Sequence, residues 1–314
     1  MLLFAPFIVC TLALLLDRVL GEPLRLHPIV GFGRLVSALE KTCNTSPARP
    51  QQSLLAGLAA LLLLTLPMLA VAVWVSSVLD GLWLIVAQAV TVWLAISLRG
   101  LAEHGQAVAD PLHKGDLVHA QHQVSHIVSR QASALDAQGV AAAATESMLE
   151  NGADAVFATL FWFLVAGIPG VVMHRMVNTL DAMWGYRNPQ FLYFGRAAAR
   201  LDDILGWLPA RLTALTYVLL GNRKLAVECW RNQAPQWDSP NAGPVMAAGA
   251  GALNVQLGGP SPYPSGIKQR PLLGGTDKAG AASIEAAIRL VRHGVWFWLL
   301  VILMLTVLAA VIGV

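Results

Sequence analysis

Long uncharged apolar segments constrain this chain more than any other feature. Residues 54–79 and 82–98 contain no charged side chain, and only Asp80 and Gly81 separate them. Spanning a bilayer takes roughly 20 consecutive apolar residues. Charged residues make up 12% of the chain, whereas soluble domains contain about 25%. The sequence therefore predicts an all-α, polytopic integral membrane protein in which these two segments form a helical hairpin.

The apolar segments predict four or five membrane helices, with re-entrant segments as an alternative for some of them. The segments are residues 2–16, 54–79, 82–98, 155–173, 205–220 and 295–314. The first has no basic region before it and no small-residue cleavage site after it, so we expect a membrane helix rather than a cleaved signal peptide. Pro169, between Gly167 and Gly170, should break the fourth segment. The fifth contains Pro209 and Arg211, so a span, a re-entrant segment and a buried helix remain alternatives.

Lysine and arginine predict the orientation. They gather in residues 17–53, 99–154 and 221–294, and cytoplasmic loops carry an excess of these residues. We expect these three loops in the cytoplasm, mainly helical in 99–154, and one membrane-embedded domain over residues 1–314. The loop 174–204 is also basic, so we expect it to face the cytoplasm or a cavity open to it. The net charge of +3 does not indicate nucleic-acid binding.

An acidic stripe precedes the fourth apolar segment. Glu146, Glu150 and Asp154 are spaced i, i+4, i+8, so on an α-helix they would share one face. Oxygen ligands of this kind suit Mg²⁺, which typically takes one or two carboxylates together with substrate phosphates. The alternative is a solvated acidic helix face.

Carboxylates and carboxamides also follow the fourth segment. Asn178 and Asp181 lie three residues apart, and Asp202 and Asp203 come after Arg200. This last group could equally be a ladder of ion pairs along a helix. Arg211 lies within an apolar segment, where its guanidinium would suit a phosphate or carboxylate or would extend to the interface.

Two further groups of residues are weaker candidates. Ser239 to Gly243 precede an Ala- and Gly-rich helix whose N-terminus could hold an anion, and Gly258 and Gly259 continue as a flexible loop. No phosphate-binding glycine motif is present. His119, His122 and His126 share a predicted helix face; with no cysteine nearby, we interpret them as a solvated face rather than a metal site.

The polar motifs together resemble a known family. They stand in the order of that family over essentially the whole chain: Asp17 with Gly21-Glu22-Pro23 and His27-Pro28, Glu146-Ser147 with Glu150-Asn151 and Asp154, Pro169-Gly170, Asn178-Thr179-Leu180-Asp181, Phe194-Gly195, Asp202-Asp203, Pro209-Ala210-Arg211, Ser239-Pro240-Asn241-Ala242-Gly243 and Leu257-Gly258-Gly259. The chain resembles the CobD/CbiB family, the membrane-bound adenosylcobinamide-phosphate synthases of cobalamin biosynthesis.

This resemblance implies an amide-forming enzyme of the bacterial inner membrane, with its active site facing the cytoplasm. It would join adenosylcobyric acid to aminopropanol or its O-phosphate, with ATP and Mg²⁺ as cofactors. The corrinoid, the amine, the lipid bilayer and other enzymes of the pathway would be its partners. A regulatory relative of the family that modulates β-lactamase induction, and a corrinoid transporter, are the alternatives; intramembrane polar residues also mark transport pathways.

We assign roles within this hypothesis by residue chemistry. Metal ligands would be Glu146, Glu150 and Asp154, with Asp181 as a further carboxylate. Catalytic residues would be Asn151, Asn178, Asp181, Asp202, Asp203 and Asn241, with Asp202 or Asp203 taking the proton of the attacking amine. Substrate and phosphate binding would fall to Arg130, Arg200, Arg211, Ser239, Gly243, Gly258 and Gly259. A groove lined by Trp162, Trp184, Trp207 and Tyr186 would hold the corrinoid.

Overall fold

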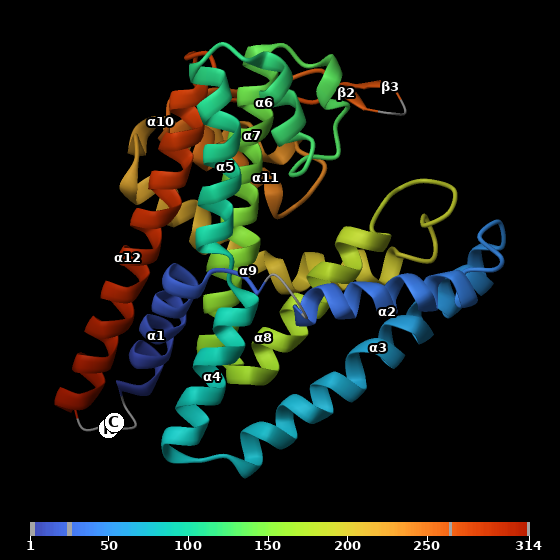
Figure 1. Cartoon of the computed structure of the whole chain (residues 1–314), viewed down its shortest axis with the longest axis vertical. Coiled ribbons are helices and arrows are strands. Elements are labelled where there is room, and N and C mark those ends of the chain that lie inside the picture. Colours follow the sequence, from blue (N-terminus) through green and yellow to red (C-terminus); the bar gives the residue numbers. More distant parts are fainter. Residues whose placement is uncertain (1–3, 24–26, 264–265, 313–314) are drawn as a thin grey trace. The chain divides into compact units, whose positions relative to one another are not determined.

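Helices form most of the structure (Figure 1). The computed structural model describes residues 4–23, 27–263 and 266–312. The α-helices are α1 (Ala5–Leu20), α2 (Pro28–Cys43), α3 (Pro50–Val78), α4 (Gly81–Ala95), α5 (Leu98–His113), α6 (Leu117–Val124), α7 (Ala137–Asn151), α8 (Ala158–Trp184), α9 (Arg196–Leu220), α10 (Arg223–Asn232), α11 (Ala242–Ala252) and α12 (Ala281–Ile312). A π-helical turn, Gly152–Phe157, joins α7 to α8, and Ala132–Ala134 and Ala234–Gln236 form short 3₁₀ turns.

Four stretches of described helix are long and apolar enough to cross a membrane. They are Pro50–Val78, Gly81–His113, Ala137–Trp184 and Ala281–Ile312. The prediction of an all-α polytopic membrane fold is therefore confirmed. The predicted first span forms the helix α1, which has only 16 residues. α9 is helical through Pro209 but is not among the four membrane-length stretches. Residues 2–3 and 313–314, at the ends of two predicted spans, lie outside the described residues.

Two predicted breaks occur where the sequence placed them. Figure 1 shows α3 and α4 joined by a short turn, and Gly81 there adopts a positive φ of 50°. In α8, Ala166 and Gly167 leave helical geometry, with φ of 58° at Gly167, just before Pro169. The helix then resumes and continues to Trp184. Asn178 and Asp181 therefore lie on a helix, where we had expected a loop beginning at residue 174.

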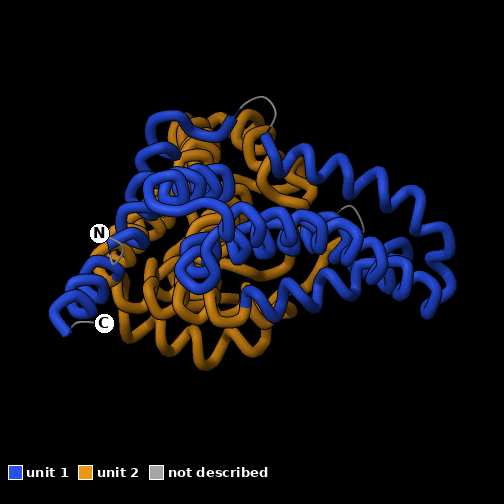
Figure 2. Tube along the Cα trace, turned by 90° about the horizontal axis from the view of Figure 1, so that it is seen from below, with its two compact units in different colours: residues 1–97, 158–206, 302–314 blue, residues 98–157, 207–301 orange. Residues whose placement is uncertain are grey.

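The described chain forms two compact units, coloured separately in Figure 2. Unit 1 contains residues 1–97, 158–206 and 302–314, and unit 2 contains residues 98–157 and 207–301. Each unit is assembled from segments that are far apart in the sequence, because the chain alternates between the two units. α9 and α12 contribute residues to both units.

Unit 1 packs its helices around α8. α2, α3 and α4 contact α8, and α1 contacts α4. The buried cluster includes Val36 of α2, Trp184 of α8 and Phe194. α3 lies so close to the backbone at Phe194 that a Cβ added at Gly57 of α3 would collide with the carbonyl oxygen of Phe194. α2 is a correction: we had treated residues 17–53 as a loop, but its buried Phe32 and Val36 make it an amphipathic helix.

Unit 2 combines helices with a small β-structure. α7 contacts α5, α6 and α11, and α10 lies against α11. The strands are β1 (Gln256–Gly258), β2 (Ser261–Tyr263), β3 (Gly266–Lys268) and β4 (Leu272–Gly274). β1 pairs with β4 and β2 with β3, both antiparallel. The glycine-rich loop that we expected to be flexible is thus held by two antiparallel strand pairs, which we call the β-ribbon.

Candidate functional site

An acidic cluster in unit 1 brings together residues of α8 and α9. The Asn178 side-chain amide donates to Asp202 Oδ1 across 3.5 Å. Burial, and then the charges of Asp181 and Asp203, raise the pKa of Asp202 to about 7, although the hydrogen bond from Asn178 lowers it. Asp202 can therefore exchange a proton near neutral pH, which is the property a general base needs.

Arginines surround this cluster. Burial raises the pKa of Asp203, and the charges of Arg200 and Arg187 oppose that shift. Arg175 Nη1 donates to Asn178 Oδ1 at 3.3 Å, so Asn178 links Arg175 to Asp202. α8 ends just beyond Asp181, where Gly185 N donates to the carbonyl oxygen of Asp181 at 2.6 Å as the last helical hydrogen bond. Four residues that the sequence singled out, Asn178, Asp181, Asp202 and Asp203, therefore lie in one electrostatic environment.

A second cluster in unit 2 is centred on Glu146 of α7. Its side chain is 4% exposed and forms ion pairs with Arg130 and with Arg270, the latter at 2.8 Å. Gly258 N donates to Glu146 Oε1 at 2.9 Å. Two arginines and one carboxylate leave this buried site with a net positive charge. A buried carboxylate with these partners ties the β-ribbon to α7.

The two arginines of this cluster have further partners. Burial alone would lower the pKa of Arg130, but the charge of Glu146 and a hydrogen bond with Tyr263 hold it above its usual range. The guanidinium of Arg270 lies 5.3 Å from the centre of the Trp237 ring, a cation–π distance. It also donates to the carbonyl oxygen of Gly259 at 3.2 Å. Both arginines are therefore held rigidly.

A third contact in unit 2 joins α9 to the start of α11. Arg211 Nη1 donates to Asn241 Oδ1 at 2.8 Å and to the carbonyl oxygen of Trp207 at 3.0 Å. Ser239 Oγ accepts from Ala242 N at 3.1 Å, so it caps α11 and takes up a backbone N–H that we had considered for an anion. Gly243 is needed for packing, since a Cβ there would lie 2.7 Å from the carbonyl oxygen of Ala234.

Comparison with known proteins identifies the family. The family model described as CobD/Cbib protein matches residues 10–291. The chain is 56% identical over 292 residues to the "Cobalamin biosynthesis protein CobD" of Stutzerimonas stutzeri, covering 93% of this chain and 95% of that protein. A Chromobacterium violaceum protein of the same name is 54% identical, over 91% and 92% of the two chains.

The chain belongs to the CobD/CbiB family. A Mycobacterium tuberculosis protein named "Cobalamin biosynthesis protein CobD" is 37% identical over 88% of both chains. No solved structure matches the chain. The resemblance read from the polar motifs is thus confirmed, and it covers both units of this CobD/CbiB protein.

The predicted acidic stripe does not form one environment in this CobD/CbiB chain. Glu146 is buried, whereas Glu150 is exposed, and Asp154 lies in the π-helical turn. Glu146 is enclosed by Arg130 and Arg270, so the three carboxylates differ in their surroundings. Among the residues that the structure describes, no three His, Cys, Asp or Glu side chains are grouped as a metal site. A Mg²⁺ ion held by one or two of these carboxylates together with substrate phosphates stays a prediction.

Other predicted residues have local roles. The Asn151 side chain donates to the carbonyl and hydroxyl oxygens of Ser147, both at 2.9 Å, within its own helix. His119, His122 and His126 are exposed, as expected for a solvated face. Trp184 does not line the expected aromatic groove, because it is 1% exposed and lies in the core of unit 1.

Sequence reasoning missed Arg270 and Arg175. Arg270 lies in a glycine- and proline-rich stretch that we interpreted as flexible, and only its charge could have drawn attention to it. Arg175 follows the Pro169 break on a helix of membrane-spanning length. An ionisable residue in such a helix is by itself a functional hypothesis, and that signal was available.

Proposed function

We propose that this protein acts in cobalamin biosynthesis by forming the amide bond between adenosylcobyric acid and aminopropanol or its O-phosphate. The product would be adenosylcobinamide or its phosphate. Membership of the CobD/CbiB family over residues 10–291, with relatives named for cobalamin biosynthesis, supports the pathway. The half-buried Asp202–Asn178 contact beside Asp181 carries the proposal of an enzyme.

The reaction makes a clear demand on that cluster. A carboxylate and an amine do not condense in water without activation, and bound ATP would supply it. The attacking nitrogen forms a bond to the acyl carbon as the activating group leaves with its electron pair, and the nitrogen must lose a proton. Asp202, whose pKa is about 7, would accept that proton at its carboxylate. Asn178, held by Arg175, would position Asp202.

Unit 2 offers groups for anions. Arg211 and Asn241 form a hydrogen-bonded pair, and a guanidinium suits a phosphate or carboxylate oxygen. The Arg130–Glu146–Arg270 cluster, with its net positive charge, would hold the glycines Gly258 and Gly259 in place. Mg²⁺ would accompany ATP, held by one or two of the carboxylates Glu146, Glu150 and Asp154 together with the ATP phosphates.

We further propose that the protein is a multi-pass protein of the bacterial inner membrane with its site facing the cytoplasm. Four membrane-length helices and the basic residues of the loops support this orientation. The lipid bilayer, the corrinoid and other enzymes of the pathway are the partners that this role requires.

The direct test is an assay of the purified protein with adenosylcobyric acid, each of the two amines, and ATP with or without Mg²⁺. We expect ATP-dependent formation of adenosylcobinamide or its phosphate, detected by mass spectrometry. Binding or vesicle uptake of corrinoid without amide formation would instead favour transport, and neither activity would favour a regulatory role.

A further inference from the structure

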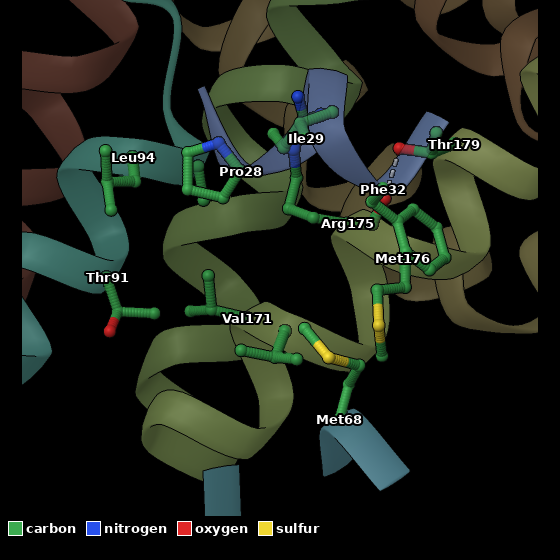
Figure 3. A pocket seen from close by; sticks show the side chains of 12 residues that line it. Pro28, Ile29, Phe32, Met68, Thr91, Leu94, Val171, Arg175, Met176 and Thr179 are labelled. Atoms are coloured by element: carbon green, nitrogen blue, oxygen red, sulfur yellow. Dashed lines mark hydrogen bonds between the residues drawn. The ribbon is translucent and has the colours of Figure 1, made fainter. Parts of the chain in front are cut away.

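A cavity in unit 1 is not used by the proposed reaction. It is partly open, has a volume of about 200 Å³, and lies among α2, α3, α4 and α8. Figure 3 shows Met68 and Val171 toward one end of it and Arg175 and Thr179 toward the other. Three of the four helices lie in membrane-length stretches, so the cavity belongs to the part of the protein expected within the bilayer.

The walls of this cavity are apolar even where threonines occur. Thr91 Oγ1 donates to the carbonyl oxygen of Ala87 at 2.8 Å, and Thr179 Oγ1 donates to that of Arg175 at 2.7 Å. Both hydroxyls are thus directed to their own helices, and the remaining lining side chains, apart from Arg175, carry no charge. A ligand inside would meet hydrocarbon along most of its length.

The other end of the cavity is positive. Arg175 carries a guanidinium that is charged at any physiological pH. Pro28 and Ile29, at the first turn of the 16-residue helix α2, line the same end, and the N-terminus of a helix carries a partial positive charge. A ligand that fits must therefore be an anion with an apolar extension.

Size restricts the choice further. Pockets for drug-sized ligands have volumes of about 300–1,000 Å³, so this cavity is too small for a corrinoid macrocycle. An apolar cavity of about 150 Å³ is known to accept a molecule of the size of benzene, and a run of methylene groups has a comparable cross-section. The bilayer itself supplies molecules that combine such a run with a phosphate.

We propose that this cavity binds an acyl chain of an anionic phospholipid, with Arg175 holding the lipid phosphate. Since Arg175 also donates to Asn178, the bound headgroup would lie one hydrogen bond from the acidic cluster. The proposal concerns lipid binding and does not depend on the reaction assigned to that cluster.

The test uses the full-length protein in vesicles that contain phosphatidylglycerol or phosphatidylcholine with a photoactivatable group on the acyl chain. Labelled peptides are mapped by mass spectrometry. Both lipids carry a phosphate, but the choline ammonium of phosphatidylcholine offsets the phosphate charge and is repelled by Arg175. We therefore expect phosphatidylglycerol to label the region around Val172 and Met176 about tenfold more than phosphatidylcholine. Arg175→Gln should remove this preference. Arg34→Gln, which removes an exposed arginine of α2, should retain it.

A second pair of variants tests the cavity itself. Val172→Phe should fill it and suppress labelling by both lipids, whereas Leu63→Phe, at a residue 62% exposed on α3, should not. Equal labelling by the two lipids, labelling confined to exposed helix faces, or an unchanged preference in Arg175→Gln would overturn the proposal. If Arg175→Gln fails to fold, competition in the wild-type protein decides: excess unlabelled phosphatidylglycerol must displace the probe more effectively than phosphatidylcholine or inorganic phosphate.

Discussion

The guanidinium of Arg211 donates to the side-chain carbonyl of Asn241 across 2.8 Å, although 30 residues separate them in the chain. This contact fixes the side-chain orientation of Asn241, whose oxygen is the acceptor, so its NH₂ group points away from Arg211. Two residues that the sequence nominated independently thus act as one unit, and each should be needed for the other's position.

Asp202 should be needed for activity. Asp202→Asn keeps the size of the side chain but cannot accept a proton, and loss of a general base lowers rates by about 10²–10⁴-fold. We expect a loss in this range in the amide-forming assay. Asp80→Asn, in the exposed α3–α4 turn, is the matched control and should retain full activity. Wild-type rates in Asp202→Asn would remove Asp202 from the mechanism.

The same residue should make stability depend on pH. The pKa of Asp202 is raised to about 7, so the folded protein retains a proton that the unfolded chain has lost. The stabilisation is full below the ordinary pKa of 3.8 and disappears as the pH rises through about 7. Thermal unfolding in detergent should therefore show wild type losing stability relative to Asp202→Asn between about pH 4 and pH 7, with little further change above that. A constant difference across this range would contradict the raised pKa.

Glu146 should be a stabilising residue. Glu146→Gln leaves Arg130 and Arg270 buried without their counter-charge, and breaking a buried pair costs about 3–5 kcal/mol. We expect a lower melting temperature and less protein in the membrane. Glu150→Gln, one helical turn further and exposed, should change stability by less than about 0.5 kcal/mol. Normal stability combined with lost activity in Glu146→Gln would instead indicate a chemical role.

Two glycines of unit 1 should respond in opposite directions. Gly57→Ala would place a methyl group against the Phe194 carbonyl oxygen, and such overpacking costs about 1–3 kcal/mol. Nothing lies within 4 Å of a Cβ at Gly31, so Gly31→Ala should stabilise α2 by about 0.5–1 kcal/mol. Melting temperatures of the two variants, compared in the same detergent, test the close approach of α3.

The exposed histidines should be dispensable. Changing His119, His122 and His126 together to Gln alters solvated side chains, and surface changes stay within about 0.5 kcal/mol each. Activity in the amide-forming assay should remain within about a factor of three. A hundredfold loss would reveal a metal site that their exposure gives no reason to expect.

Periodicity and composition correctly predicted the parts of the fold that depend on neighbouring residues in the sequence. The apolar runs predicted the membrane-length helices, Asp80-Gly81 predicted the hairpin, and Pro169 predicted the break in α8. The failures have a different origin. α2 does carry a local amphipathic pattern, with Phe32 and Val36 buried four residues apart, which our interpretation of residues 17–53 as a loop overlooked. The β-ribbon depends on the pairing of β1 with β4 and on the contact of Gly258 with Glu146, which no local pattern in residues 256–274 records.

The candidate site shows the same division. The polar motifs nominated Asn178, Asp202, Arg211 and Asn241, and the structure pairs them two by two. Within the acidic stripe, Glu146 is buried in ion pairs with Arg130 and Arg270, whereas Glu150 is exposed, and the local spacing of the carboxylates does not record these two arginines. Arg270 escaped notice because its partner Glu146 lies 124 residues away.

That separation has a consequence for how the protein is made. Arg130 and Glu146 emerge from the ribosome close together, but Arg270 follows 124 residues later, about 6 to 25 seconds at the usual rates of synthesis. During that interval residues 158–206 of unit 1 are also translated. Part of unit 1 must therefore enter the membrane before unit 2 has finished folding. Unit 2 acquires its buried charge cluster only near the end of translation.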